Sequence, residues 1–542
     1  MKKRTLSLLL AAILCVSTLA GCGNGGSSSS SPDSKPASTP ESSTVAEKDP
    51  LGADFTGYPV EDSTEELRFY VIVPWAYEVP DGVDRNENPW NQQLSEKTGI
   101  KIKWEAIPAG GDSEQSYNLL IASDNLPDIF YTNNMTGKVT QLIDDKKIYP
   151  LNDYLETYAP GYYNFVNSDD AINKSVKNDN GDYYGFVFLR ETLEMGTYSG
   201  PIVRKDLLEK LNIETPVTIA DWDAMLRAFQ ADGVKYPLGD PESYAGLGWV
   251  FAGAYGVTHG FYVEDGKVHY GYVEPGYKEF LAQMNQWYND GILEADFLGE
   301  TYESLQTKIM NSEVGATYTM SGRLPIYNDG LKEIGSSDNW IGVDYPVAKA
   351  GDVPQFIQGE SNNIGICGVI TTSCKNIPLA CRLLDYGYTD EGKLFYNFGD
   401  ESNYEIIDGE PHYTDAFVND SRGLQWMRTS YTGAASNAAT VGMLATMNTL
   451  PQSQLDALKT WYNPEGVRHI YPSAVTRTTE ESESIATEYT AIQAQVDEVV
   501  SKFIVGQESL DNWDAYVATL NSLGLEHVLE VRQAAYDRFL AR

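Results

Sequence analysis

Residues 67–73 read LRFYVIV, residues 91–97 read NQQLSEK and residues 100–104 read IKIKW. The first run has the β-branched and aromatic composition of a strand, which Pro74 and Trp75 end. The second run suits a helix closed by Gly99, and the third alternates apolar and charged side chains as a half-buried strand does. Together the three runs predict a β-α-β unit.

The alternation of strands and helices continues along the chain. A helical pattern at residues 116–123 precedes a turn at residues 126–128 and a third, buried strand at residues 129–131. A second series is expected at residues 201–203 (strand), 222–229 (helix, capped by Thr218), 276–289 and 300–311 (helices) and 315–319 (strand). Two α/β lobes are predicted, because the chain from residue 65 far exceeds one domain of about 100–150 residues.

The last sixty residues are predicted to be helical. From Ser482 onward, apolar residues recur at intervals of three and four and would form one buried stripe. They are Ile485, Tyr489, Ile492, Val496, Val499 and Phe503. Helices at residues 510–523 and 526–540 follow, with Gly524 as a C-cap between them.

The segment at residues 178–186, NDNGDYYGF, has two interpretations. Asn180-Gly181 is a hairpin turn signal flanked by aromatic residues. The spacing of Asn and Asp also resembles a calcium loop, but no acid occupies the twelfth position, where an EF-hand has its bidentate Glu. The hairpin is the favoured prediction.

The N-terminus has the layout of a secretory leader at residues 1–21. Three basic residues precede an apolar run at residues 6–20, which is shorter than the about 20 residues of a membrane span. Leu19-Ala20-Gly21-Cys22 resembles a lipobox, so we expect diacylglycerol on Cys22 and anchoring on the outer face of the cell membrane. An ordinary leader with a chance cysteine is the alternative. Residues 22–64, rich in Ser, Pro and Gly, predict a flexible tether.

The sequence has 77 acidic and 39 basic residues, a net charge of −38. This charge would repel the phosphates of nucleic acid and disfavours an anionic polymer as ligand. Cys367, Cys374 and Cys381 lack the spacing of a zinc site. Three buried thiols are favoured, with one disulfide plus a free thiol as the alternative.

Four stretches of the mature chain are each a weak signal, but their order and spacing along the chain are specific when taken together. They are residues 88–91 (NPWN) through 98–100 (TGI), residues 126–129 (LPDI), residues 202–208 (IVRKDLL) with Pro216 and Trp222, and residues 509–513 (SLDNW) to Tyr536. In them the chain resembles the family 1 extracellular solute-binding proteins, especially their long lipoprotein branch in Firmicutes. The resemblance implies two α/β lobes of the class II binding-protein type, each a mixed sheet flanked by helices, joined by hinge segments that close on a ligand.

The same resemblance implies a function and a division into lobes. The protein would capture an oligosaccharide as a monomer, deliver it to the transmembrane subunits of an ABC permease with a separate ATPase, and catalyse nothing. Lobe 1 would take residues 65–190 plus 355–405 and lobe 2 residues 191–354 plus 406–542, with crossings near residues 186–200 and 353–363.

Relatives often have a calcium loop after the helix at Trp222. Here residues 229–238 read FQADGVKYPL with a single acid, so no structural calcium is expected there. No other metal and no cofactor is expected.

A sugar site needs aromatic rings for the apolar ring faces and planar polar groups for the hydroxyls. Ligands of open α/β sheets lie beyond the carboxyl ends of strands. The candidates are Trp75, Tyr131, Asn133, Tyr318 and Arg323 at strand ends, Trp249, Tyr255 and Trp426 as further aromatic residues, and Glu191 and Glu360 near the crossings. For each aromatic residue, packing in a core is an equal alternative to ligand contact. For the two glutamates, the alternative is an ion pair with an arginine across the hinge.

Other functions compete with this prediction. A secreted glycoside hydrolase needs a carboxylate pair about 5–10 Å apart, but no motif places two acids at strand ends. The five histidines form no His-x-x-x-His pair, and neither a Gly-x-Ser-x-Gly elbow nor a Walker loop occurs. A peptide-binding or sensor lipoprotein on the same scaffold is the nearer alternative.

Overall fold

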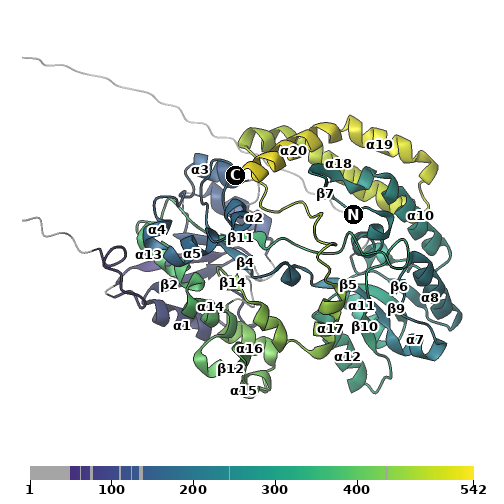
Figure 1. Cartoon of the computed structure of the whole chain (residues 1–542), viewed down its shortest axis with the longest axis horizontal. Coiled ribbons are helices and arrows are strands. Elements are labelled where there is room, and N and C mark those ends of the chain that lie inside the picture. Colours follow the sequence, from purple (N-terminus) through teal and green to yellow (C-terminus); the bar gives the residue numbers. More distant parts are fainter. Residues whose placement is uncertain are drawn as a thin grey trace, which may run out of the picture. The chain divides into compact units, whose positions relative to one another are not determined.

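The computed structural model describes residues 49–542 except 62, 74–76, 109–110, 124, 134–137, 243 and 434–437. The predicted leader, Cys22 and most of the predicted tether lie outside the described residues. Residues 49–542 form one compact unit that contains two main sheets and two hairpins (Figure 1). In this part of the chain no helix is long and apolar enough to span a bilayer.

The first sheet has the strand order β14-β4-β11-β3-β1-β2. β1 (Glu66–Val71) pairs in parallel with β2 (Lys101–Ala106) and β3 (Ile129–Thr132), and α1 (Pro89–Thr98) joins β1 to β2, which confirms the β-α-β unit. Gly99 ends α1 with φ 71°, a left-handed conformation that glycine adopts without strain. β11 (Asn363–Ile370) runs antiparallel to β3 and to β4 (Phe186–Arg190), so the sheet is mixed.

An aromatic core supports this sheet. Phe69 on β1 lies 4.6 Å from Trp104 and 5.2 Å from Tyr77 between ring centroids, and Tyr77 meets Tyr131 edge-on at 5.0 Å. The helices of this lobe are α2 (Ser113–Ala122), α3 (Val139–Asp144), α4 (Leu155–Tyr158), α5 (Pro160–Val166), α6 (Asp170–Ser175), α13 (Ile377–Asp385) and α14 (Asp390–Phe398). Close packing of these rings holds β1, β2 and β3 in place relative to one another.

The second sheet has the order β10-β5-β9-β6. β5 (Ser199–Arg204) is antiparallel to β9 (Val314–Met320) and β10 (Trp340–Gly342), whereas β6 (Tyr236–Gly239) is parallel to β9. α8 (Ile219–Ala231) begins at the predicted Thr218 cap and buries Trp222. The other elements of this lobe are α7 (Lys205–Leu211), α9 (Tyr244–Phe251), the hairpin of β7 (Phe261–Glu264) and β8 (Lys267–Tyr270), α10 (Pro275–Asn289), α11 (Tyr302–Met310), α12 (Arg323–Glu333) and α17 (Gln452–Trp461).

The helical C-terminus is confirmed as α18 (Thr479–Val505), α19 (Trp513–Ser522) and α20 (Leu525–Ala541). The predicted stripe on α18 faces the core of the second lobe, with Tyr489 and Val499 half-buried and the other members buried. α18 packs against α10 and α20, and Figure 1 shows these C-terminal helices, in yellow-green to yellow, beside the teal α10.

The chain passes between the sheets three times within the described residues: from β4 to β5, from β10 to β11, and from β14 (Val441–Gly442) to α17. The predicted lobe boundary at residue 405 is wrong, because β14 pairs with β4. β4 would otherwise present an unpaired edge, and the carbonyls of Thr440 and Gly442 accept from the amides of Leu189 and Glu191. The hairpin of β12 (Tyr404–Ile407) and β13 (Glu410–Tyr413), α15 (Asp415–Val418) and α16 (Leu424–Tyr431) precede β14, and α16 contacts α1.

The predicted hairpin turn at residues 178–182 is closed by an antiparallel bridge between Lys177 and Tyr183. Asn178 Oδ1 accepts from the amides of Asn180 and Asp182 at 3.0 and 2.9 Å. This hydrogen bonding holds the turn, and it leaves the Asp179 carboxylate free to meet the C-terminal helix.

Arg538 and Arg542 of that segment form a clasp with Asp179. Arg538 Nε and Arg542 Nη2 donate to the carboxylate at 2.8 and 2.5 Å, and Arg542, with a side chain only 6% exposed, also donates to the carbonyls of Lys174 and Lys177. Burial alone would raise the pKa of Asp179, but the hydrogen bonds from Arg542 and Arg538 lower it below its ordinary value. The clasp ties the second lobe's last helix to the first lobe.

Cys367, Cys374 and Cys381 are free and buried, which confirms the favoured prediction. Burial raises the pKa of Cys374 to about 12. These thiols therefore pack as small apolar side chains.

Asp179→Ala should lower the free energy of unfolding by about 3 kcal/mol, because it leaves the buried Arg542 without its acid. Arg538 keeps its pairing with Glu481 in this variant. Chemical denaturation at neutral pH measures the change. Glu209→Ala is the matched control, since it breaks a Lys–Glu pair whose side chains are 47% and 69% exposed, and it should change stability little.

A pH series gives a second readout for the clasp. Because the folded-state pKa of Asp179 is lowered, its contribution is complete above the unfolded pKa of about 3.9 and is lost as pH falls through the folded pKa. The stability difference between the wild type and Asp179→Ala should shrink below about pH 4. A difference that stays constant on acidification contradicts the ion pairing.

Candidate functional site

Polar side chains follow the strand ends of both sheets beside the crossings. Asn133 follows β3 and Glu191 follows β4, whose carboxyl ends share one edge because β11 is antiparallel to both. In the second sheet Asp240 follows β6 and Arg323 comes shortly after β9, and these two strands are parallel. Such edges are where ligands bind in open α/β sheets.

The first two crossing segments are tied together by Gln358, whose side chain is buried. Gln358 Oε1 accepts from the amides of Tyr198 and Ser199 at 2.8 and 3.0 Å, and Nε2 donates to the carbonyl of Gly196 at 3.2 Å. Gly196 is so close to the second segment that a Cβ would lie 2.4 Å from the carbonyl oxygen of Glu360. The two segments form one ribbon in fixed register, here called the hinge ribbon.

Glu360 carries the charge of the hinge ribbon. It pairs with Arg190 at 2.6 Å and accepts from the hydroxyl of Tyr198 at 3.1 Å, so the arginine pairing that was one of its two expected roles is confirmed. The Arg190 side chain is 9% exposed and that of Glu360 36%, which makes the carboxylate the accessible half of the pair. Burial, and then the charge of Glu360, raise the pKa of Tyr198.

A second polar cluster lies at the ends of β6 and β9. The Tyr302 hydroxyl donates to Glu242 at 2.5 Å, and the Arg323 guanidinium lies 4.1 Å from the centre of the Tyr302 ring. Burial, and then the hydrogen bond to Glu242, raise the pKa of Tyr302. Burial and then Glu360 are the main causes of the raised pKa of Tyr198, and the charge of Glu242 adds to it.

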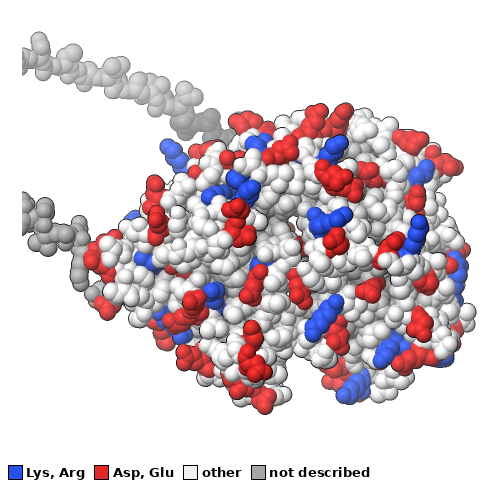
Figure 2. Space-filling model, in the orientation of Figure 1, with Lys and Arg blue, Asp and Glu red and all other residues white. Residues whose placement is uncertain are grey.

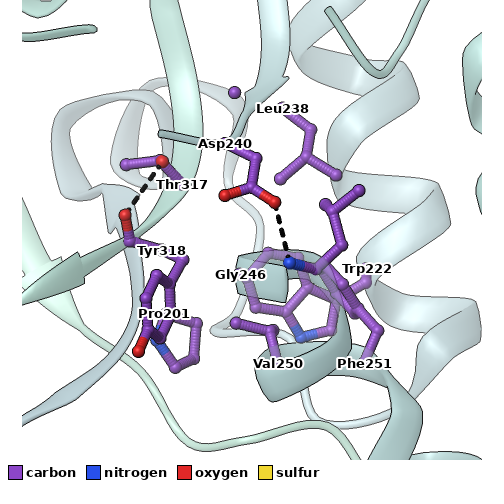
Figure 3. Close-up of a pocket in the computed structure, with 11 residues that line it drawn as sticks. Pro201, Trp222, Leu238, Asp240, Gly246, Val250, Phe251, Thr317 and Tyr318 are labelled. Carbon is purple, nitrogen blue, oxygen red and sulfur yellow. Dashed lines mark hydrogen bonds between the residues drawn. The ribbon is translucent and has the colours of Figure 1, made fainter. Parts of the chain in front are cut away.

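Asp240 holds the loop that carries Glu242. It is fully buried and accepts from the amides of Glu242 and Leu247 at 3.0 and 2.8 Å, and so begins α9 (Figure 3). The cavity between α9 and the sheet has a volume of about 10 Å³, room for about one water molecule. The space under α9 is therefore too small for a solute. Asp240, which lines it, supports the site by holding the loop of Glu242.

Ligand contact was predicted for Tyr131 and Tyr318, and both predictions are wrong. Tyr131 is 0% exposed and Tyr318 5% exposed, in the cores of the first and second lobes. β3 is buried along its whole length and β9 up to its last residue, so a ring within either strand packs in a core. Figure 3 shows the Tyr318 ring beside Pro201, at the wall of the small cavity under α9.

The other predicted residues have mixed surroundings and stay predictions. Glu191 is exposed, accepts from the Leu444 amide at 2.6 Å and lines a cavity of about 510 Å³ beside the third crossing. Asn133 is half-buried, and its Oδ1 has no hydrogen-bond partner among the described residues. Trp249 lies in the last turn of α9 beside His259, whereas Trp75 lies outside the described residues.

Tyr255 and Trp426 contact side chains of their own lobes. Tyr255 lies 6.5 Å from the Phe280 ring, and burial raises its pKa to about 12. Trp426 packs under the Arg422 guanidinium at 4.1 Å and near the Tyr431 ring. The packing alternative describes both residues better than ligand contact does.

Tyr198, Glu242, Tyr302 and Gln358 were not predicted. Tyr198 and Gln358 lie inside the predicted crossings, so their polar side chains there were an available signal. Glu242 depends on recognising β6, whose sequence Tyr-Pro-Leu-Gly is short and contains a proline that disfavours a strand.

A family model for the bacterial extracellular solute-binding proteins matches residues 90–392 of this chain. The protein belongs to this family. The fructooligosaccharide ABC transporter substrate-binding protein FusA of Streptococcus pneumoniae is 24% identical over 503 residues, which cover 84% of this chain and 88% of FusA. Lipoprotein LipO of Bacillus subtilis is 22% identical over 344 residues, 60% of this chain and 65% of LipO.

Solved structures of solute-binding proteins share the fold. An HMO-binding, ABC-transporter-associated solute-binding protein from Bifidobacterium longum infantis matches with a TM-score of 0.72 and 17% identity, over 88% of this chain and 99% of that one. FusA in complex with kestose matches with a TM-score of 0.67 and 21% identity, over 88% of this chain and all of the other. The predicted fold of two lobes, each a mixed sheet flanked by helices, is confirmed.

Proposed function

We propose that this solute-binding protein is the substrate-binding subunit of an ABC importer and that its solute is an oligosaccharide. The observation that carries the proposal is the hinge ribbon, where Glu360, Arg190 and Tyr198 present an acceptor, a donor and a hydroxyl beside each other. FusA, named for fructooligosaccharide, and the HMO-binding protein have the same fold. The family itself is extracellular.

The chemistry of these groups suits sugar hydroxyls, which donate and accept hydrogen bonds at once. Glu360 accepts, Arg190 donates and Tyr198 can do either, while Trp249 on α9 offers an aromatic face for the apolar side of a sugar ring. A sugar held by one lobe gains further contacts when the other approaches, so its extra affinity for the closed form drives closure. The permease then binds the closed monomer, and the protein itself catalyses nothing.

The surface charge adds to the argument about partners. Figure 2 shows Asp and Glu side chains spread over one whole face of the protein, with Lys and Arg between them. With a net charge of −38 for the chain, nucleic acid or another polyanion would be repelled at long range. An uncharged solute meets no such barrier.

We also propose that Cys22 is lipidated and anchors the protein on the outer face of the membrane, with residues 22–64 as the tether. The lipobox-like sequence supports this, and LipO is a lipoprotein by name. In cells that carry the full-length gene, Cys22→Ser should release the protein into the medium or leave it unprocessed, and should abolish labelling by palmitate. Palmitate labelling that persists in Cys22→Ser excludes this cysteine as the anchor.

A thermal-shift screen tests the central proposal. The chain from residue 23 to 542 is mixed with neutral and acidic oligosaccharides, monosaccharides and short peptides, because a solute that binds only the native state raises the melting temperature. A rise of several degrees with one class of oligosaccharide, recovered intact by mass spectrometry, is the expected result. A rise with peptides alone, or recovery of a cleaved sugar, overturns the proposal.

A further inference from the structure

Two arginines of the second lobe lie near each other without an acidic partner. Arg477 directly precedes Thr478, the N-cap of α18, and Arg532 lies on α20. Among the described residues no carboxylate forms an ion pair with either guanidinium, and the Nε atom of each is buried without a hydrogen-bond partner. A guanidinium withdrawn from water without a counter-charge raises the free energy of the fold.

Aromatic rings hold the Arg532 guanidinium. It lies 3.8 Å from the centre of the Phe261 ring, 5.0 Å from that of Tyr489 and 5.6 Å from that of Tyr471. A ring that stacks on the flat face of a guanidinium leaves the terminal N–H groups at its edge available to a ligand.

The Arg477 side chain acts on the same group. Burial, and then the charge of Arg532, lower the pKa of Arg477. Burial raises the pKa of Tyr471, and the charges of Arg532 and Arg477 oppose that rise. The Tyr471 hydroxyl donates to the carbonyl of Arg532 at 3.3 Å. Two positive charges therefore meet around Tyr471, and each disfavours the other.

The acids of this region are already paired. Glu481, whose charge acts on Arg477, accepts from both terminal nitrogens of Arg538, from one of them at 2.7 Å. Asp179 accepts from Arg538 and Arg542 in the clasp. Four arginines thus share two carboxylates, which leaves a local excess of positive charge in a chain whose net charge is −38.

The arginine pair adjoins the candidate site. Phe261 and Tyr471 line a cavity of about 190 Å³ whose wall includes Phe356 and Gly359 of the hinge ribbon. Glu360 is the next residue along the ribbon. The cavity therefore leads from the ribbon to the rings that the arginines contact.

An oxyanion is the ligand chemistry that matches two neighbouring guanidiniums. Carboxylate and sulfate groups accept paired N–H bonds from the planar fork of arginine. The repulsion of polyanions by the whole chain acts at long range and is screened beyond about 8 Å at physiological ionic strength. One anionic group in contact with the arginines is attracted at short distance, where the local charges dominate.

We propose that Arg477 and Arg532 bind one oxyanion, a carboxylate or a sulfate, and that this group belongs to the solute held at the hinge ribbon. The proposal rests on the proposed function and adds the charge of the oligosaccharide to it. The bound group offsets the repulsion between the two guanidiniums, whereas a neutral sugar in the same place leaves it. Affinity therefore depends on the charge of the solute.

Matched pairs of sugars test this dependence. Isothermal titration calorimetry on the chain from residue 23 to 542 compares trigalacturonate with galactotriose, 3′-sialyllactose with lactose, and any other acidic oligosaccharide that raises the melting temperature with its neutral counterpart. The wild type should bind at least one acidic sugar about tenfold or more tightly than its neutral counterpart. In Arg477→Met and Arg532→Met, which keep an unbranched side chain and remove the charge, the ratio should fall below about twofold.

A control variant and a free ion complete the experiment. Arg422 also stacks on an aromatic ring, that of Trp426 at 4.1 Å, but its charge is paired with Asp420 at 2.7 Å. Arg422→Met should therefore keep the wild-type ratio. Melting temperatures in millimolar sodium sulfate, against sodium chloride of the same ionic strength, show whether a free oxyanion binds, and those without additions show which variants are folded.

The outcomes distinguish the arginine site from the function. If the wild type binds none of the sugars, the proposed function is contradicted. If it binds acidic and neutral counterparts equally, or neutral sugars alone, the function stands and the arginine site is wrong. An acidic preference that persists in both folded methionine variants excludes these two arginines. A rise of the melting temperature with sulfate that Arg477→Met abolishes, without binding of any acidic sugar, shows a site for a free ion and overturns the link to the solute.

Discussion

Two lobes can close on a solute only if the segments that join them twist without slipping past each other. Gln358 meets this constraint by hydrogen-bonding the amides of Tyr198 and Ser199 and the carbonyl of Gly196 across the hinge ribbon. Its buried position raises the energetic penalty for losing these bonds, because the freed backbone groups would stay unpaired away from water. Gln358 thus holds the register of the hinge together with the Tyr345 hydroxyl, which bonds Ser199 and Gln358, and Glu360 is then oriented by Arg190 and Tyr198.

Two groups of charged side chains connect the lobes, one at the hinge ribbon and one at the C-terminal helix. Arg190 is nearly buried and Glu360 is more exposed, so the carboxylate is the solvent-accessible half of the pair and the arginine sets its orientation. Away from the ribbon, the clasp of Asp179 with Arg538 and Arg542 joins the last helix to the first lobe. Any closing motion must either turn about this clasp or break it. An account of closure therefore has to include the C-terminal helix as well as the hinge ribbon.

Local patterns in the sequence were sufficient for much of the fold. The β-α-β unit, the Thr218 cap and the apolar stripe on α18 each depend on neighbours within one or two turns, where composition and periodicity act directly. The pairing of Val441–Gly442 with β4 was missed because a two-residue strand has no periodicity and its partner is about 250 residues away. Long-range pairing of this kind sets lobe boundaries.

The candidate site was predicted less well for a related reason. Strand ends and crossings were located, and Glu360 and Arg323 lie where the argument placed them. The predictions of ligand contact for Tyr131 and Tyr318 failed because both rings are buried. The rule that ligands lie beyond the carboxyl ends of strands does not say at which residue a strand leaves the core. The contact of Tyr302 with Glu242 spans 60 residues and depends on the loop that Asp240 holds. Only the folded chain brings such groups together.

A crystal structure of the chain from residue 23 to 542, grown with the oligosaccharide that raises its melting temperature most, tests the central claim most directly. The account predicts an intact sugar between the lobes, with hydroxyls within hydrogen-bond distance of Glu360 or Tyr198 and with contacts from both lobes. A sugar held on the outer surface of one lobe, with the hinge ribbon unoccupied, would contradict it.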